Sequence, residues 1–72
     1  MGDLRGVHMV GAALDIRVNG LSNRQFGEII KEAHRAISDI RELLRYCELL
    51  NTASGAVVHI DTGRVRNNVF GW

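Results

Sequence analysis

An apolar stripe through the middle of the chain constrains the fold more than any other feature of the sequence. Apolar residues recur there in alternating steps of four and three, which places them on one face of an α-helix. The stripe consists of Phe26, Ile30, Ala33, Ile37, Ile40, Leu44 and Cys47, and Ile29, Ala36, Leu43 and Leu50 widen it on one side. Charged residues of both signs fill most of the remaining positions and keep the opposite face solvated.

Both ends of this helix have sequence signals. Ser22 and Gln25 have the spacing of a capping box, and Leu21 and Phe26 flank it as a hydrophobic staple. The run Asn-Thr-Ala-Ser-Gly at 51–55 is typical of a helix stop. The sequence therefore predicts one continuous helix over about 22–50.

Alternating and β-rich segments flank the helix. Leu14, Ile16 and Val18 alternate with polar residues, which is the period of a half-buried strand, and apolar residues further upstream extend this prediction to about 7–18. After the helix, β-rich runs at 56–60 and 64–70 predict a hairpin over about 56–70. We expect a single α+β domain of β-α-β-β order, in which one long amphipathic helix packs on a small antiparallel sheet.

The tripeptide Asp61-Thr62-Gly63, between these two runs, resembles the start of the catalytic loop of an aspartic protease. It also suits a three-residue hairpin loop, because Gly adopts the left-handed conformation of the last position without steric cost. In a protease, two such loops share one proton between two carboxylates. Arg64 follows where that family has a small residue, and its cation would hold both carboxylates ionised. We interpret the tripeptide as a turn and predict no catalytic residue.

The length of the predicted helix implies assembly. A helix over 22–50 would be about 43 Å long, whereas a compact globule of this size has a diameter of about 30 Å. Apolar residues at the end of the stripe would then lack an intrachain cover, which implies a second polypeptide and, most simply, another copy of the chain. The residues predicted for self-association are Ile30, Ile37, Ile40, Leu44 and Cys47.

A break in the helix near Ser38 is the alternative. Helices from Ser22 to about Ile37 and from Asp39 to Leu50, after a strand at 12–18, would resemble a ribbon-helix-helix DNA-binding dimer. The resemblance implies that polar residues of the strand, Asp15 among them, face a major groove. The stripe runs through this point without a glycine or a turn cluster, and an acidic residue is a poor groove reader beside phosphates.

Composition excludes several classes of protein. Cys47 is the only cysteine, so no intrachain disulfide forms and a reducing, cytoplasmic location is expected. The apolar runs are too short for a membrane span, and the net charge of +1 includes no basic arm for nucleic acid. The spacings of His8, His34, His59 and Cys47 match no metal-ligand motif. We expect no metal and no cofactor.

These observations favour a non-enzymatic protein-interaction module. It would act as a homo-oligomer by occlusion or scaffolding, as an adaptor or inhibitor of the kind that phages and other mobile elements encode. The residues predicted to bind a partner are Tyr46, Leu49, Arg64, Arg66, Phe70 and Trp72. Trp72 has a second interpretation, in which it folds back over the end of the helix. A small nucleic-acid-binding dimer is the alternative function, and a ligand-binding oligomer or an enzyme would need a pocket between subunits.

Overall fold

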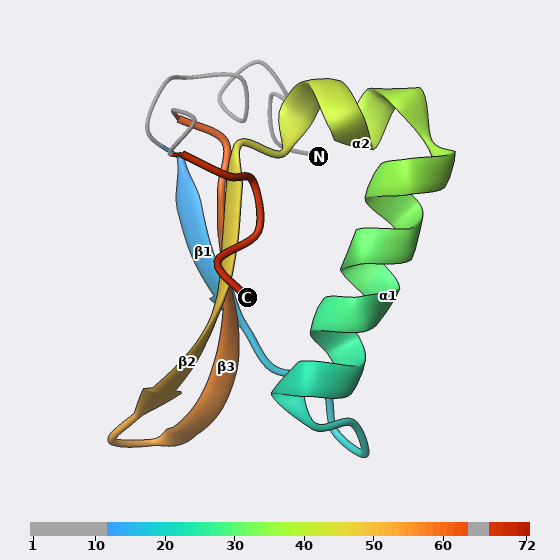
Figure 1. Cartoon of the computed structure of the whole chain (residues 1–72). Helices are drawn as coiled ribbons and strands as arrows, with labels where there is room; N and C mark the ends of the chain where they lie inside the picture. The colour runs from blue at the N-terminus through green and yellow to red at the C-terminus, as the bar shows by residue number, and fades with distance from the viewer. Residues whose placement is uncertain (1–11, 64–66) are drawn as a thin grey trace, which may run out of the picture.

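Two consecutive helices and a three-stranded antiparallel sheet make up the computed structural model, which describes residues 12–63 and 67–72 (Figure 1). The elements in chain order are β1 (Ala13–Ile16), α1 (Asn23–Ala36), α2 (Ser38–Leu43), β2 (Tyr46–Thr52) and β3 (Gly55–Asp61). The predicted α+β fold, with a small antiparallel sheet and a main helix, is confirmed. Of the strand predicted over about 7–18, the structure shows β1, and residues 1–11 lie outside the described part of the chain.

The central strand of the sheet is β3, because the strand order is β1-β3-β2. Both neighbours run antiparallel to β3, so β1 and β2 are parallel to each other. Parallel strands cannot be joined by a tight turn. The two helices therefore form the crossover that carries the chain from one edge of the sheet to the other.

The start of α1 follows the sequence signal. The backbone N–H of Gln25 donates to Ser22 Oγ at 3.0 Å, and the backbone N–H of Ser22 donates to Gln25 Oε1 at 2.8 Å. The capping box is therefore complete, and it satisfies N–H groups that the first turn of a helix leaves without an intrahelical acceptor.

The prediction of one helix over 22–50 is wrong. Helix α1 ends at Ala36, Ile37 is extended with φ −121° and ψ 116°, and α2 ends at Leu43. A β-branched residue tolerates this extended backbone. The guanidinium of Arg41 stabilises the break, because its Nη1 donates to the carbonyls of Arg35 at 2.6 Å and His34 at 3.3 Å. These carbonyls lie at the C-terminus of α1, where acceptors lack intrahelical donors.

The last five residues of the predicted helix, 46–50, belong to β2. Its apolar residues fit either period, because Cys47 and Leu49 are two positions apart and face the helices when the chain is extended. The stop signal at 51–55 is real but ends a strand: Gly55, with φ +119°, begins β3 after a tight turn at Ala53 and Ser54. The β2–β3 hairpin is thus built around this turn.

The hairpin predicted over about 56–70 is also wrong. Strand β3 pairs with β1 and β2, and it ends at Asp61, whose Oδ1 accepts from the backbone N–H of Gly63 at 2.6 Å. After residues 64–66, which lie outside the described ranges, the chain runs beside β2. Cys47 N–H donates to Val69 at 2.7 Å, and Gly71 N–H donates to Cys47 at 2.8 Å. The C-terminal segment therefore pairs in parallel with the outer edge of β2.

The core lies between the helices and one face of β2 and β3. Leu44, Cys47 and Val58 are buried at its centre. Partly buried residues pack around them, namely Phe26, Ile30, Ile40, Leu49, Ile60, Val69, Phe70 and Trp72. The principal extents are 30 × 26 × 23 Å, and neither helix is longer than the molecule, so helix length no longer implies a second polypeptide. The break at Ile37 lets one chain cover most of its own stripe.

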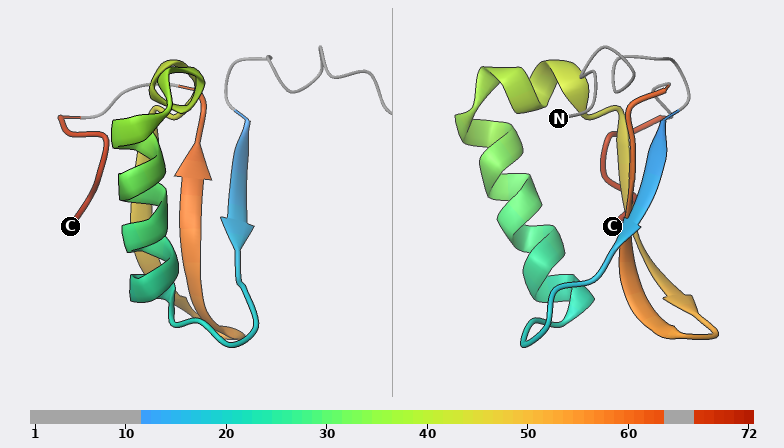
Figure 2. Two further views of the ribbon diagram at one scale, coloured as in Figure 1. Left: turned by 90° about the vertical axis from the view of Figure 1, so that its right-hand side faces the viewer. Right: turned by 180° about the vertical axis from the view of Figure 1, so that it is seen from behind.

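The helix layer does not cover the whole sheet. Among the described elements, α1 packs against β2 and β3 but not against β1. The left view of Figure 2 shows this offset, with β1 standing beside the helix rather than behind it. One face of the edge strand β1 is therefore left without a helix over it.

The buried thiol of Cys47 predicts a loss of stability at alkaline pH. Burial raises the pKa of Cys47 to about 11, from an ordinary value of 9.0. Above pH 9 the unfolded chain releases this proton while the folded chain keeps it, so the free energy of unfolding falls as pH rises towards 11. We expect urea denaturation to show an extra loss of about 1 kcal/mol between pH 8 and 10 in the wild type relative to Cys47→Ala. Lysine and tyrosine titrations are common to both proteins, so equal losses would contradict the prediction.

Candidate interaction surface

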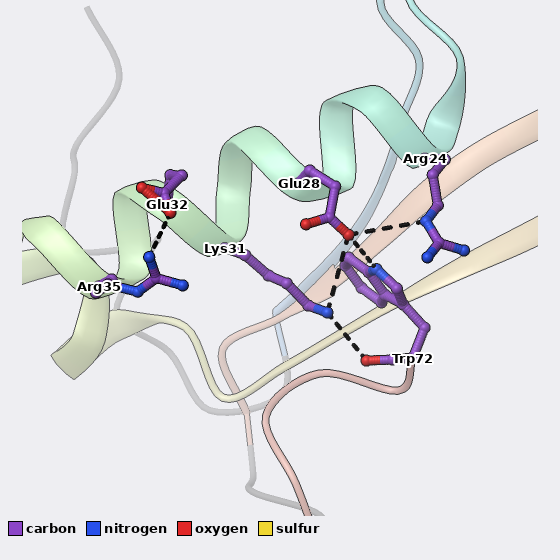
Figure 3. A network of polar contacts seen from close by, with 6 residues as sticks. All are labelled: Arg24, Glu28, Lys31, Glu32, Arg35 and Trp72. Atoms are coloured by element: carbon purple, nitrogen blue, oxygen red, sulfur yellow. Dashed lines mark hydrogen bonds and ion pairs between the residues drawn. The ribbon is translucent and has the colours of Figure 1, made fainter.

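The aromatic side chains at the C-terminal end pack against the chain itself. The indole N–H of Trp72 donates to Glu28 Oε2 at 3.0 Å, and Lys31 Nζ donates to the backbone carbonyl of Trp72 at 3.1 Å (Figure 3). The ammonium of Lys31 lies 4.4 Å from the centroid of the Trp72 ring, within the range of a cation–π interaction. The Trp72 hydrogen bond, more than the nearby cations, lowers the pKa of Glu28. Of the two interpretations of Trp72, the structure shows the fold-back, against the first half of α1.

The indole reaches the helix because position 27 has no side chain. A Cβ on Gly27 would lie 2.7 Å from Trp72 Cζ2 and 2.8 Å from Leu49 Cδ2, closer than real Cβ contacts. The phenyl ring of Phe70 continues this packing, with edge-to-face contacts to Trp72 at 5.4 Å and to His34 at 5.1 Å between ring centroids. These aromatic groups, which the sequence assigned to a partner, close the core over the edge of β2.

The other described residues predicted to bind a partner lie near the same two rings. Tyr46 lines a hollow with Phe70, and Leu49 meets Trp72 at Gly27. Tyr46 is buried and Leu49 is half-buried in the core, while Arg64 and Arg66 lie outside the described residues. An open hollow of about 630 Å³ does lie beside the C-terminal segment. The aromatic rings in its lining, those of Phe70 and Trp72, have the ammonium of Lys31 at 5.6 Å and 4.4 Å from their centroids. The structure thus brings Phe70 and Trp72 together beside this hollow, with both rings near the ammonium of Lys31.

The residues predicted for self-association lie largely inside the molecule. Leu44 and Cys47 are buried in the core, and Ile30 and Ile40 pack against it. Only Ile37, at the break between the helices, remains substantially exposed, at 47%. The physical reason is the chain reversal after α2, which covers the stripe with β2 and β3 instead of with a second subunit.

An apolar groove lies at the opposite side of α1, where the helix layer leaves β1 uncovered. Its volume is about 240 Å³. The lining comes from four elements and from the residues that directly follow α2 and β3, and consists of Ile16, Phe26, Ile30, Ile40, Leu43, Leu44, Ile60 and Thr62. The threonine hydroxyl is the one polar group in this lining, and it donates to the Ala12 carbonyl at 3.2 Å. The surface of the groove is therefore almost wholly apolar.

Exposed leucine and isoleucine side chains border the groove. Leu14 is 59% exposed and lies opposite Ile60 in the β1–β3 register, on the same face of the sheet. Leu43 is 44% exposed and lines the groove from α2. Ile29 is 53% exposed. It follows Gly27 by two residues, and because each residue turns an α-helix by about 100°, it lies on the flank of α1 opposite Gly27 and Trp72. We call the groove together with Leu14, Ile29 and Leu43 the groove face.

A polar row occupies the other face of the sheet. His59 Nδ1 lies 2.8 Å from Asp15 Oδ1, and His59 Nε2 lies 4.0 Å from Asp61 Oδ2. Glu48 is the cross-strand neighbour of His59 on β2. A histidine between carboxylates can hold β1 to β3 by a hydrogen bond. Within the described ranges, however, no group of three or more His, Cys, Asp or Glu side chains could hold a metal ion.

Part of the groove face had a signal in the sequence. Ile29 and Leu43 belong to the positions that widen the stripe beyond what one side of a small sheet can cover, and Leu14 belongs to the alternation of β1. Their exposure depends on where α1 lies across the sheet, which the sequence pattern does not specify. Arg41 as the cap of α1 had no signal, because its acceptors are backbone carbonyls.

Comparisons with protein-family models, with curated proteins and with solved structures found no match. None of the helices in residues 12–63 and 67–72 is long and apolar enough to cross a membrane.

The close approach of Trp72 to the helix predicts the effect of Gly27→Ala. Relative to glycine, alanine stabilises an isolated helix by about 1 kcal/mol. Here, however, its Cβ would displace the Trp72 indole and the Leu49 methyl. We expect a net loss of about 1–3 kcal/mol in the free energy of unfolding, as for other overpacked sites. In a Trp72→Ala background the same substitution should cost less or become stabilising, as a double-mutant cycle by urea denaturation would measure. A full cost in both backgrounds would show that Trp72 does not limit this position.

Proposed function

We propose that the chain is a non-enzymatic protein-interaction module whose working surface is the groove face. The observation that supports this most is the gathering of three exposed aliphatic side chains, Leu14, Ile29 and Leu43, around an apolar groove. Each large aliphatic side chain left in water forgoes about 1.5–3 kcal/mol of burial. A contiguous patch of this kind marks a binding surface more often than scattered exposed leucines do.

The dimensions of the groove favour a protein partner. Its volume of about 240 Å³ lies below the range of about 300–1,000 Å³ that is usual for small-molecule sites. Inserted aliphatic or aromatic side chains would fill such a space, with the rim leucines around them. Binding would act by occlusion or scaffolding, since whatever lies on the groove face is held against β1 and both helices.

The chemistry of the surface supports binding rather than catalysis. The described lining of the groove contains one hydroxyl, on Thr62, and no ionisable side chain. General acid–base or nucleophilic catalysis needs at least two groups placed to exchange a proton. The polar row of Asp15, His59 and Asp61 lies on the other face of the sheet, where alternate side chains of β3 point away from the core.

Site-specific photo-crosslinking tests this function. Replacing Leu43 by p-benzoylphenylalanine places the probe on the groove face, and replacing Arg24, which is exposed on α1, gives the matched control. In cells of the source organism we expect an adduct of defined mass from position 43 and none of that mass from position 24. The adduct should disappear when Leu14→Lys is added, because a charge on the rim opposes burial.

Folding of these variants is checked separately by circular dichroism. Leu14→Lys is expected to change the free energy of unfolding by less than about 0.5 kcal/mol, because the side chain is already mostly exposed. Persistence of the same adduct in the Leu14→Lys variant, or adducts from both probe positions, would contradict the assignment of the groove face. Absence of any adduct from position 43 would contradict the function.

A further inference from the structure

We propose, on the basis of the function above, that the partner on the groove face is a second copy of this chain. The two β1 strands would pair antiparallel about a two-fold axis, with Ile16 facing Ile16 of the partner subunit and Asp15 facing Arg17 of the partner subunit.

The outer edge of β1 offers backbone groups for this pairing. Thr62 N–H donates to the Ala12 carbonyl at 2.9 Å, so the backbone of residue 12 is directed towards β3. Direction alternates along an antiparallel strand, and residues 14 and 16 therefore also point inwards while residues 13 and 15 point outwards. Residue 17, which follows β1, would point outwards in a strand that the pairing extends. Within residues 12–63 and 67–72, β1 is an edge strand, and β3 is the one strand that pairs with it.

Hydrogen bonding restricts the register of a β1–β1 pair. Residues directly opposed in an antiparallel pair either both face the other strand with their N–H and C=O groups or both face away. An outward residue must therefore oppose another outward residue. Near the middle of the strand, Asp15 can oppose Ala13, Asp15 or Arg17 of the partner subunit.

Charge selects one of these three registers. Asp15 against the partner's Asp15 is repulsive, and Asp15 against the partner's Ala13 is neutral. Asp15 against the partner's Arg17 is attractive, and the two-fold axis repeats the pair. Both side chains have an atom left for this ion pair. Asp15 contacts His59 through Oδ1, which leaves Oδ2. Arg17 donates through Nε to Ala56 and through Nη2 to Ser54, which leaves Nη1.

The same register matches the apolar face. It places Ile16 against the partner's Ile16 and Leu14 against the partner's Val18. Ile16 and Leu14 lie on the side of the groove, and Val18, which follows β1, would lie there in a strand that the pairing extends. A two-fold axis perpendicular to the sheet keeps both helix layers on one side. Ile29 and Leu43 of the two copies would then approach each other above the paired β1 strands, in the space that α1 leaves uncovered (Figure 2).

Two single charge reversals give the sharpest test. Asp15→Arg leaves arginine at both 15 and 17, and Arg17→Asp leaves aspartate at both, so each variant repels itself in the proposed register. Mixed together, they restore two attractive pairs. By sedimentation equilibrium of the purified chain we expect a wild-type dimer at micromolar concentration, a dissociation constant raised by about tenfold or more for each variant alone, and recovery in the equimolar mixture.

The mixture also separates pairing from folding. Arg17→Asp removes the in-chain bonds to Ser54 and Ala56, but a second, different variant cannot repair damage within a subunit. A monomeric wild type at 100 µM, unchanged dimerisation of either variant, or failure of the mixture to recover would each overturn the proposal.

A disulfide test reports the register even if the charge variants fold poorly. Ile16 would oppose its own copy in a pair that is not hydrogen-bonded, where the two Cα atoms are about 4.5 Å apart and within disulfide range. We expect Ile16→Cys to form a covalent dimer on mild oxidation and Leu14→Cys, about 14 Å from its own copy in this register, to remain monomeric. The wild type is the control, because Cys47 is buried. Cross-linking of Leu14→Cys alone, or of neither variant, would overturn the proposal.

The two proposals fail in different ways. If the pure chain is monomeric but forms a groove-dependent adduct with another protein, the proposed dimer is wrong and the proposed interaction function is supported. A monomeric chain with no adduct at all would remove both. An adduct of twice the mass of the chain would support both.

Discussion

The packing of Cys47 and Val58 beneath the two helices is the constraint on which the rest of the structure depends. A chain this short buries a modest share of its surface, so nearly every apolar group near the centre must contribute. The stripe can be covered by one chain only if the helix stops and the polypeptide returns as strands. The extended backbone at Ile37 and the cap that Arg41 provides make that stop, and β2 then carries Cys47 under the helices that precede it.

The position of α1 follows from how the two sides of the core are filled. On the side of β2, Phe70 and Trp72 enter beside the helix, and Gly27 gives the indole direct access to the helix backbone. Aromatic side chains bury more area than any others. On the side of β1, Phe26 is the one aromatic side chain among the described residues that lines the groove, and the groove stays open. The same asymmetry therefore produces both the closed aromatic edge and the open apolar one.

The sequence predicted the class of the fold and the start of its main helix, because both depend on local periodicity and on a capping pattern. It failed where two periods fit the same residues. Leu44, Cys47 and Leu50 satisfy a helix, while Cys47 and Leu49 satisfy a strand, and the choice is made by tertiary burial rather than by propensity. The candidate surface was missed for a related reason. Exposure of Leu14 depends on the lateral placement of α1, which is a property of the assembled layers.

The C-terminal segment beside β2 has a further consequence for how such a molecule associates. Open strand edges invite addition of further chains, and an unlimited series of them ends in fibres. Here residues 69–71 occupy part of the edge of β2 at Cys47, while the edge of β1 stays accessible among the described residues. In the proposed dimer, a sheet that is blunted on one margin and receptive on the other would join one companion and then stop, and residues 69–71 would oppose runaway polymerisation.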